Sequence, residues 1–250
     1  MSLVDLDKEK VWHPFTQMKD ALITPVVRGE GVFLFDENGN KYIDAVSSWW
    51  VKIHGHSHPY LRQKIDEQFG QLDHVIFAGF THPKAVEAAD RLTAKLPGDL
   101  NKVFYSDNGS TANEIGLKMA LQFWHNQGIT KTKVIAFEGS YHGDTFGGMS
   151  VSARSTFSDP FRSHLFDTEY VPTPTPENMD ELKATFSETC AKGDVAAFIY
   201  EPIVQGVRGM VMYRPELLNE LLTIAKQHQV ICIADEVMTG FGRTGTLFAS

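Results

Sequence analysis

VICIADEV, residues 230–237, is an apolar run broken only by two acidic residues near its carboxyl end. Such a run predicts a strand buried on both faces, as in a parallel sheet with helices on each side. Ligands bind at the carboxyl ends of these strands, where Asp235 lies. A buried carboxylate is costly unless it meets a cationic group. The alternative is that Asp235 only caps the following turn.

Strands and helices alternate along most of the chain. A hairpin is expected at 29–46, with its turn at Asp36–Asn40. The apolar spacing predicts helices at 59–71, 83–96, 111–126 and 215–228, and strands at 102–106, 133–137, 196–201 and 230–235. This alternation predicts an α/β fold with a mostly parallel central sheet and helices on both faces.

The composition is that of a globular protein with an acidic balance. Of 250 residues, 42% are hydrophobic and 22% are charged, and the formal net charge is −8. An acidic chain is a poor candidate for a nucleic-acid partner, although backbone N–H groups can still bind a phosphate. Cys190 and Cys232 show neither zinc spacing nor a disulfide framework, which favours a reducing compartment. With no signal peptide and no apolar stretch of roughly 20 residues, we expect a cytoplasmic protein without a membrane partner.

Asp107–Thr111 lies between an expected strand and an expected helix. Gly109 would let the backbone approach a ligand closely, and Ser110 offers a hydroxyl and a helix cap. The free N–H groups of a first helical turn favour a phosphate. A plain turn with a helix cap is the alternative interpretation.

The glycine-rich segment Glu138–Gly148 follows the next expected strand. Tyr141 could stack on a flat ring, and Asp144 could meet a cationic substrate group. A glycine-rich loop with a packed aromatic residue explains the same pattern equally well. After the third strand, Glu201 and Gln205 either support a site or belong to an ordinary loop.

Three other patterns indicate different functions, but each lacks a feature that its function requires. GFGRTG at 240–245 matches a dinucleotide fingerprint, but it does not follow the strand directly and no helix is expected after it. ICIADE at 231–236 resembles a Walker B strand, but the chain has no P-loop motif. His54, His56 and His58 could face one metal ion, but no acidic or cysteine cluster matches them. A dehydrogenase, an ATPase and a metal site are therefore disfavoured.

Eight motifs, taken together, resemble the class III aminotransferases of pyridoxal-phosphate (PLP) fold type I. They are WHPFTQM (12–18), SSWW (47–50), IHGHSHP (53–59), THPKAVEAADRL (81–92), DNGSTANEIGLKMALQFW (107–124), GSYHGDTFGGMS (139–150), EPIVQGVRGMVMY (201–213) and ADEVMTGFGRTGTLFA (234–249). SSWW and YHGDTFG are the most specific. The resemblance spans nearly the whole chain and implies PLP as cofactor.

The resemblance assigns cofactor-binding roles to residues at the strand ends. Gly109 and Ser110 would bind the phosphate of PLP. Tyr141 would stack over the ring and contact substrate. Asp235 would pair with the pyridine nitrogen, and Val237 would pack under the ring.

The resemblance also implies a set of substrate-binding residues. Trp49 and Trp50 would line the substrate pocket, and Asp144 and Arg243 fall in motifs that shape it. Phe15 stands where the family usually has a tyrosine. A hydroxyl that helps to recognise substrate is therefore missing at this position.

The implied activity is a transamination in biotin synthesis. S-adenosylmethionine would donate an amino group to 8-amino-7-oxononanoate, giving 7,8-diaminononanoate, in a homodimeric enzyme. We expect 1–55 to belong to a small domain and 56–250 to the large PLP-binding domain. The reactive lysine is expected beyond Ser250, because no lysine follows Asp235. The alternatives are another class III aminotransferase for ω-amines or diamines such as lysine, and a non-catalytic PLP-fold binding protein.

Overall fold

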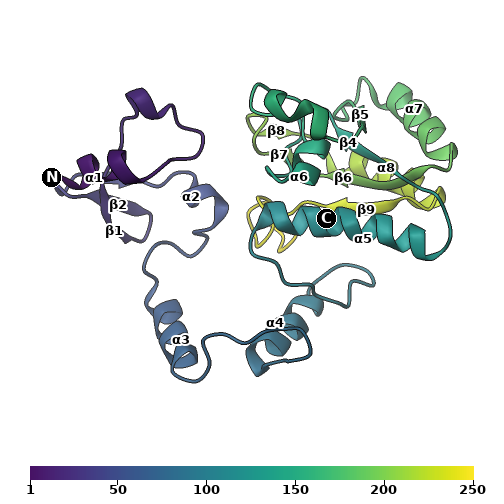
Figure 1. The fold of residues 1–250 in the computed structure, drawn as a ribbon. Coiled ribbons are helices and arrows are strands. Elements are labelled where there is room, and N and C mark those ends of the chain that lie inside the picture. Colours follow the sequence, from purple (N-terminus) through teal and green to yellow (C-terminus); the bar gives the residue numbers. More distant parts are fainter. The chain divides into compact units, whose positions relative to one another are not determined.

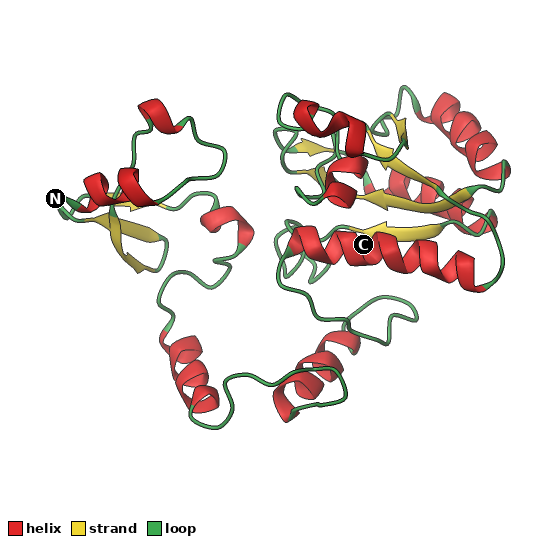
Figure 2. Ribbon diagram, viewed as in Figure 1, coloured by secondary structure: helices red, strands yellow, loops and turns green.

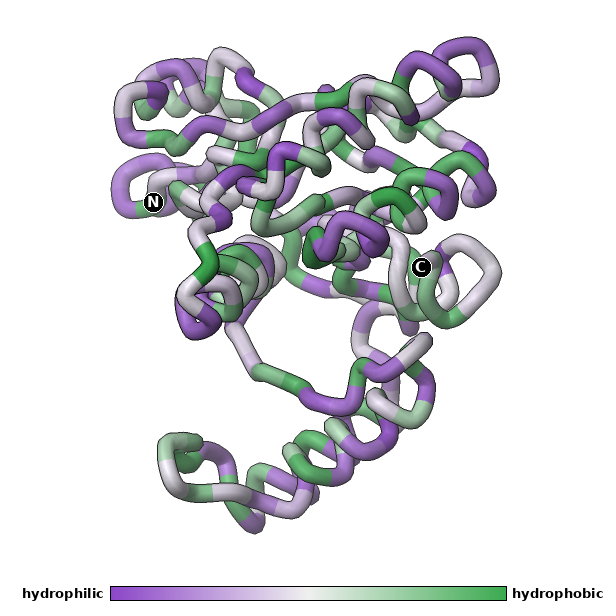
Figure 3. The backbone as a smooth tube through the Cα atoms, turned by 90° about the vertical axis from the view of Figure 1, so that its right-hand side faces the viewer, coloured by the Kyte–Doolittle hydropathy of each residue, from purple (hydrophilic) through white to green (hydrophobic).

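The computed structural model describes residues 1–250 as two compact units, Met1–His82 and Pro83–Ser250 (Figure 1). The larger unit is a layered α/β structure, and the smaller one combines a short antiparallel sheet with short helices (Figure 2). Hydrophobic and hydrophilic segments alternate along the chain (Figure 3). None of the helices combines the length and the apolar character that a membrane crossing requires.

The larger unit is built on a four-stranded parallel sheet with the order β5-β4-β6-β9. Its strands are β4 (Lys133–Phe137), β5 (Thr168–Val171), β6 (Val195–Tyr200) and β9 (Ile231–Ala234). The expected α/β fold with a parallel sheet is thus confirmed. Asp235 follows β9 directly, and its N–H donates to the Tyr200 carbonyl at 2.8 Å. The carboxyl ends of β6 and β9 therefore lie side by side.

Two apolar clusters cover opposite faces of this sheet. The covering helices are α5 (Gly109–Asn126), α6 (Phe146–Val151), α7 (Met179–Ala191) and α8 (Pro215–Gln227). Phe137 and Phe198 pack with α7 and α8 on one face. Ala136 and Ile199 pack with α5 and α6 on the other. Because successive side chains of a strand point to opposite faces, all of β6 is buried.

One expected strand is wrong. Residues 102–106 form no strand, and Phe104 is exposed. Tyr105 instead donates its hydroxyl to the Ala85 carbonyl. An apolar run predicts an extended segment, but a strand also needs a neighbour with which to pair. The four expected helices are confirmed as α3 (Pro59–Phe69), α4 (Pro83–Thr93), α5 and α8.

The smaller unit contains the predicted hairpin. Its antiparallel strands are β1 (Val26–Glu30), β2 (Phe33–Asp36) and β3 (Lys41–Ile43). At the turn between β2 and β3, the Asp36 carboxylate accepts the N–H groups of Asn38 at 2.9 Å and Asn40 at 2.8 Å. The Asn40 side chain also donates from Nδ2 to Asp36 Oδ2 at 2.8 Å. This bond, followed by the others, holds the pKa of Asp36 below its usual value. Gly39 supplies the positive φ, 81°, that the turn requires.

The remaining elements are short or lie on the surface. They are α1 (Leu3–Lys10), the 3₁₀ helices η1 (Met18–Asp20) and η2 (Asp159–His164), α2 (Ser47–Trp50), and the paired strands β7 (Val204–Gln205) and β8 (Val211–Met212). Of these, β7 and β8 pair antiparallel, and Glu201 lies in the short connection between β6 and β7.

Candidate functional site

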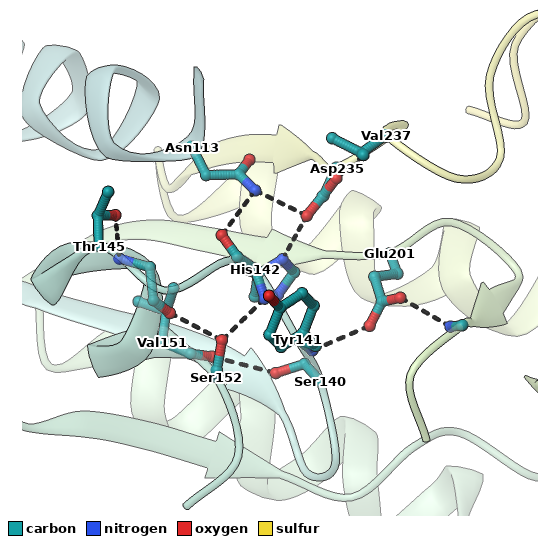
Figure 4. Close-up of polar contacts among 12 residues, drawn as sticks. Asn113, Ser140, Tyr141, His142, Thr145, Val151, Ser152, Glu201, Asp235 and Val237 are labelled. Atoms are coloured by element: carbon teal, nitrogen blue, oxygen red, sulfur yellow. Dashed lines mark hydrogen bonds and ion pairs between the residues drawn. The ribbon is translucent and has the colours of Figure 1, made fainter. Parts of the chain in front are cut away.

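Asp235 is the centre of a buried polar network at the carboxyl end of β9. Its side chain reaches α5 and the loop after β4 (Figure 4). Oδ2 accepts hydrogen bonds from Asn113 Nδ2 and from His142 Nδ1, both at 2.8 Å. Oδ1 accepts the N–H of Val237 at 3.1 Å. Only 6% of Asp235 is exposed, so these three donors replace water around the carboxylate.

His142 bonds to this carboxylate through one ring nitrogen. Its Nδ1 must carry a proton to donate to Asp235. Its Nε2 is buried and has no hydrogen-bond partner, and a proton there would be an unsatisfied buried donor. The ionisable partner of Asp235 is His142, and no lysine or arginine pairs with it. The buried carboxylate therefore suits a cationic ligand group.

The N-terminus of α5 offers two free donors. Asn108 caps the helix by accepting the N–H of Thr111, and Thr111 Oγ1 accepts the N–H of Asn108 in return. The N–H groups of Gly109 and Ser110 have no hydrogen-bond acceptor. Unpaired N–H groups at the positive end of an 18-residue helix favour an anion such as a phosphate.

Close packing joins the helix N-terminus to the acidic strand end. A Cβ built on Gly109 would lie 2.7 Å from Val237 Cγ2, two residues after Asp235. Asn113, one turn along α5, bonds to Asp235 itself. The predicted phosphate-binding pair and the predicted acid therefore lie at one site.

Tyr141 lies beside His142 on the same loop (Figure 4). Its N–H donates to Glu201 Oε1 at 3.1 Å, and its hydroxyl donates to Asp144 Oδ2 at 2.7 Å. Burial and the Asp144 hydrogen bond raise the pKa of Tyr141 far above its usual value, so the phenol stays protonated at neutral pH. The side chain is half-buried, which leaves part of the ring for a ligand.

Glu201 and Gln205 hold the loops around Tyr141 rather than facing solvent. Glu201 Oε2 accepts the N–H of Gly206 at 2.8 Å, and desolvation raises the pKa of this buried carboxyl. Gln205 is fully buried, and its Nε2 donates to the Glu138 carbonyl at 3.0 Å. The sequence alone left open whether Glu201 and Gln205 support a site or belong to an ordinary loop. Their hydrogen bonds show that both support the loop that carries Tyr141.

Arg243 lies in the turns that follow β9. Its Nε donates to the Met238 carbonyl at 2.7 Å. GFGRTG lies in a run of turns and bends from 237 to 247, and it does not follow β9 directly. The dinucleotide interpretation therefore lacks its structural context. Glu236 orders the same segment, because its carboxylate accepts the N–H groups of Ala249 and Ser250.

Phe15, Trp49 and Trp50 belong to the smaller unit. The rings of Phe15 and Trp49 meet edge to face, with centroids 5.5 Å apart. Trp49 and Trp50 lie in a left-handed turn, with φ of 57° and 72°. His56 Nε2 bonds to Asp44 at 2.8 Å and takes part in the fold of this unit. The structure contains no group of three metal-binding side chains.

Asn113 and His142 were not singled out in the sequence. His142 lies inside the motif YHGDTFG, so its neighbours could have drawn attention to it. Asn113 gives a weaker signal, a polar residue among the apolar positions of a helix. Neither pattern reveals that both side chains meet Asp235, because that contact joins segments 93 and 122 residues apart.

Known proteins similar to this chain are aminotransferases. The sequence model of the family described as aminotransferase class-III matches residues 15–250. Adenosylmethionine-8-amino-7-oxononanoate aminotransferase of Synechococcus elongatus is 48% identical over 248 residues, which cover 96% of this chain and 58% of the relative. The enzyme of the same name from Aquifex aeolicus is 40% identical, with 97% of this chain and 57% of the relative covered. The chain thus spans about 58% of the length of the curated relatives it matches.

The solved structures similar to this chain are also aminotransferases or transaminases. The structure of adenosylmethionine-8-amino-7-oxononanoate aminotransferase from Methanocaldococcus jannaschii has a TM-score of 0.90 and 37% identity, covering 98% of this chain and 56% of that one. An omega transaminase from Pseudomonas jessenii, solved in complex with PMP, has a TM-score of 0.93 and 28% identity, covering 100% and 59%.

Proposed function

Because the chain belongs to the class-III aminotransferase family, we propose that its protein transfers an amino group from S-adenosylmethionine to 8-amino-7-oxononanoate. The product would be 7,8-diaminononanoate, a precursor of biotin. Relatives with 37–48% identity that carry this name support the proposal. A homodimer in the cytoplasm is part of the proposal, as is the division into a small domain (1–55) and a large one (56–250).

PLP is the cofactor of this family, and the site has donors and charges that fit it. The free N–H groups of Gly109 and Ser110 would hold the phosphate. Asp235 would meet the protonated pyridine nitrogen, and Tyr141 and Val237 would lie against the faces of the ring. When bound, PLP withdraws electrons from the amino-bearing carbon of a substrate and so weakens its C–H bond.

The observation that carries the proposal is the buried carboxylate of Asp235, which pairs with no lysine or arginine. Burying a negative charge without a cationic partner is costly. A protonated pyridine nitrogen supplies that partner, and the Asp235 charge in turn favours the protonated ring. His142 and Val237 hold the carboxylate in place during this pairing. Neither a helix cap nor an ordinary turn residue needs such an arrangement.

The substrates would contact the aromatic and charged residues that the sequence analysis assigned to the substrate pocket. Trp49, Trp50 and Phe15 would offer apolar surface to the carbon chain of 8-amino-7-oxononanoate. Asp144 and Arg243 carry opposite charges and would meet the polar groups of the substrates. Asp144 is already positioned by the Tyr141 hydroxyl.

The test is a donor comparison with the full-length protein reconstituted with PLP. S-adenosylmethionine should bleach the visible absorbance of the bound cofactor. Addition of 8-amino-7-oxononanoate should then restore the absorbance and yield 7,8-diaminononanoate, identified by mass spectrometry. Bleaching by lysine but not by S-adenosylmethionine would overturn the proposed donor.

A second candidate is an ω-amine transaminase, which the high TM-scores of such enzymes support. In that case simple primary amines would bleach the cofactor, and no diaminononanoate would form. A protein that binds PLP but responds to no amine would instead be a non-catalytic member of the fold.

A further inference from the structure

Asn113 ties together three segments around Asp235. It lies on α5 and is only 6% exposed. Its Nδ2 donates to the His142 carbonyl at 3.0 Å and to Asp235 Oδ2 at 2.8 Å. Both hydrogens of the amide nitrogen are therefore used, one on the loop after β4 and one at the end of β9 (Figure 4).

The hydrogen bonds of Asp235 leave one acceptor position open. A carboxylate has about four lone-pair positions, two on each oxygen. Asn113 and His142 occupy both positions of Oδ2, and the N–H of Val237 occupies one on Oδ1. The remaining position is on Oδ1. With two donors on one oxygen and one on the other, the carboxylate cannot rotate without breaking hydrogen bonds.

We propose that Asn113 is a positioning residue that fixes the Asp235 carboxylate so that a single acceptor position, on Oδ1, remains for the pyridine N–H of PLP. The inference rests on the proposed function, since it assumes that PLP is the ligand. Asn113 acts through Asp235 and through the backbone of His142, and it does not itself contact the cofactor in this role.

Without Asn113 the Asp235 carboxylate would lose one of the donors that fix its orientation, but it would keep its charge. His142 alone would hold Oδ2, and the carboxylate would have two open positions, one on each oxygen. The His142 carbonyl would also lose its donor. The pairing with the pyridine nitrogen should weaken, whereas the N–H groups of Gly109 and Ser110, which would bind the phosphate, remain on the backbone of α5.

The test compares two cofactors in Asn113→Leu and in the unchanged protein, using the full-length chain. One is PLP, and the other is its 1-deaza analogue, in which a C–H group replaces the ring nitrogen. Both compounds carry the same aldehyde and phosphate. The measured quantity is the preference for PLP, the Kd of the analogue divided by the Kd of PLP, obtained by absorbance titration.

We expect Asn113→Leu to lower this preference about tenfold, which corresponds to 1.4 kcal/mol, with little change in the Kd of the analogue. The control is Asn126→Leu, the same substitution at the exposed end of α5, where the Asn126 side chain accepts a hydrogen bond from Gln122 Nε2. This control should keep the preference of the unchanged protein. Asn113→Ala removes the same donors with less bulk and should reproduce the result if the leucine variant folds poorly.

Equal weakening of both compounds, with an unchanged preference, would overturn the inference and leave Asn113 a structural residue. Failure of the unchanged protein to bind PLP would be a different result. It would overturn the proposed cofactor site, and the positioning role with it.

Discussion

Gly143 packs directly against Ser110. A Cβ built on Gly143 would lie 2.3 Å from Ser110 Oγ and 2.7 Å from Ser110 Cα. The φ of Gly143 is 103°, in the range that favours glycine. Ser110 Oγ also accepts the N–H of Thr145 at 3.0 Å. The loop after β4 thus rests on the first turn of α5, where a phosphate would bind.

Gly143→Ala should destabilise the larger unit severely. The new methyl group would overlap both the side chain and the backbone of Ser110, and the backbone would be strained. We expect the free energy of unfolding in urea to fall by about 2–4 kcal/mol. Gly193→Ala is the control, because Gly193 also has a positive φ, 78°, but nothing within 4 Å of its Cβ position. It should cost only about 1–2 kcal/mol, and equal losses would show that backbone strain alone matters.

The ring of Tyr141, rather than its hydroxyl, should contribute most to cofactor binding. Tyr141→Phe removes the hydrogen bond to Asp144 but keeps the aromatic surface. We expect the Kd of PLP to change less than about threefold in this variant. Tyr141→Ala should weaken binding about tenfold, because the stacking surface is lost. A phenylalanine variant that binds as poorly as the alanine variant would contradict this assignment.

Both cysteines should resist alkylation in the native state. Burial raises the pKa of Cys190 to about 11 and that of Cys232 to about 11. At pH 8 only about one thiol in a thousand is ionised at such a pKa, and the thiolate is the reactive form. Labelling by iodoacetamide should be slow in the native protein and fast in urea. Because the unfolded thiols ionise near pH 9, stability should fall as the pH rises from about 9 to 11.

The sequence predicted the parts of the site that each strand end carries by itself. The apolar run that ends on Asp235 and the turn Asp107–Thr111 before the helix predicted at 111–126 are local patterns. The shared location of these residues follows from parallel topology, since the carboxyl ends of the strands lie at one edge. For these elements local sequence and fold agree.

The failures share a different cause. The expected strand at 102–106 required knowledge of its neighbour, and the role of Asn113 required knowledge of what faces α5. Both are long-range pairings that hydrophobic periodicity does not encode. The left-handed turn at 47–50 was also missed, because it contains no glycine to indicate it.

Asp44 holds that left-handed turn. Four consecutive residues, Ser47–Trp50, have φ between 46° and 72°, and this conformation costs about 1–2 kcal/mol for each non-glycine residue. Asp44 Oδ1 accepts the N–H of Ser48 at 2.9 Å, and Oδ2 accepts its hydroxyl at 2.7 Å. His56 bonds to the same Oδ2. These contacts offset the strain of a turn that carries two of the expected substrate-binding residues.

Asp44→Ala should therefore loosen the turn. We expect amide hydrogens between residues 44 and 52 to exchange several-fold faster, as measured by mass spectrometry, because local opening costs less free energy. Asp20→Ala, at an exposed position of η1, should leave this exchange unchanged. The Ser48 and His56 bonds, led by the Ser48 hydroxyl, hold the pKa of Asp44 below 3.8. The protection of these amide hydrogens should thus be present above about pH 4 and lost as the pH falls further. A turn that exchanges equally slowly with and without Asp44 would contradict this role.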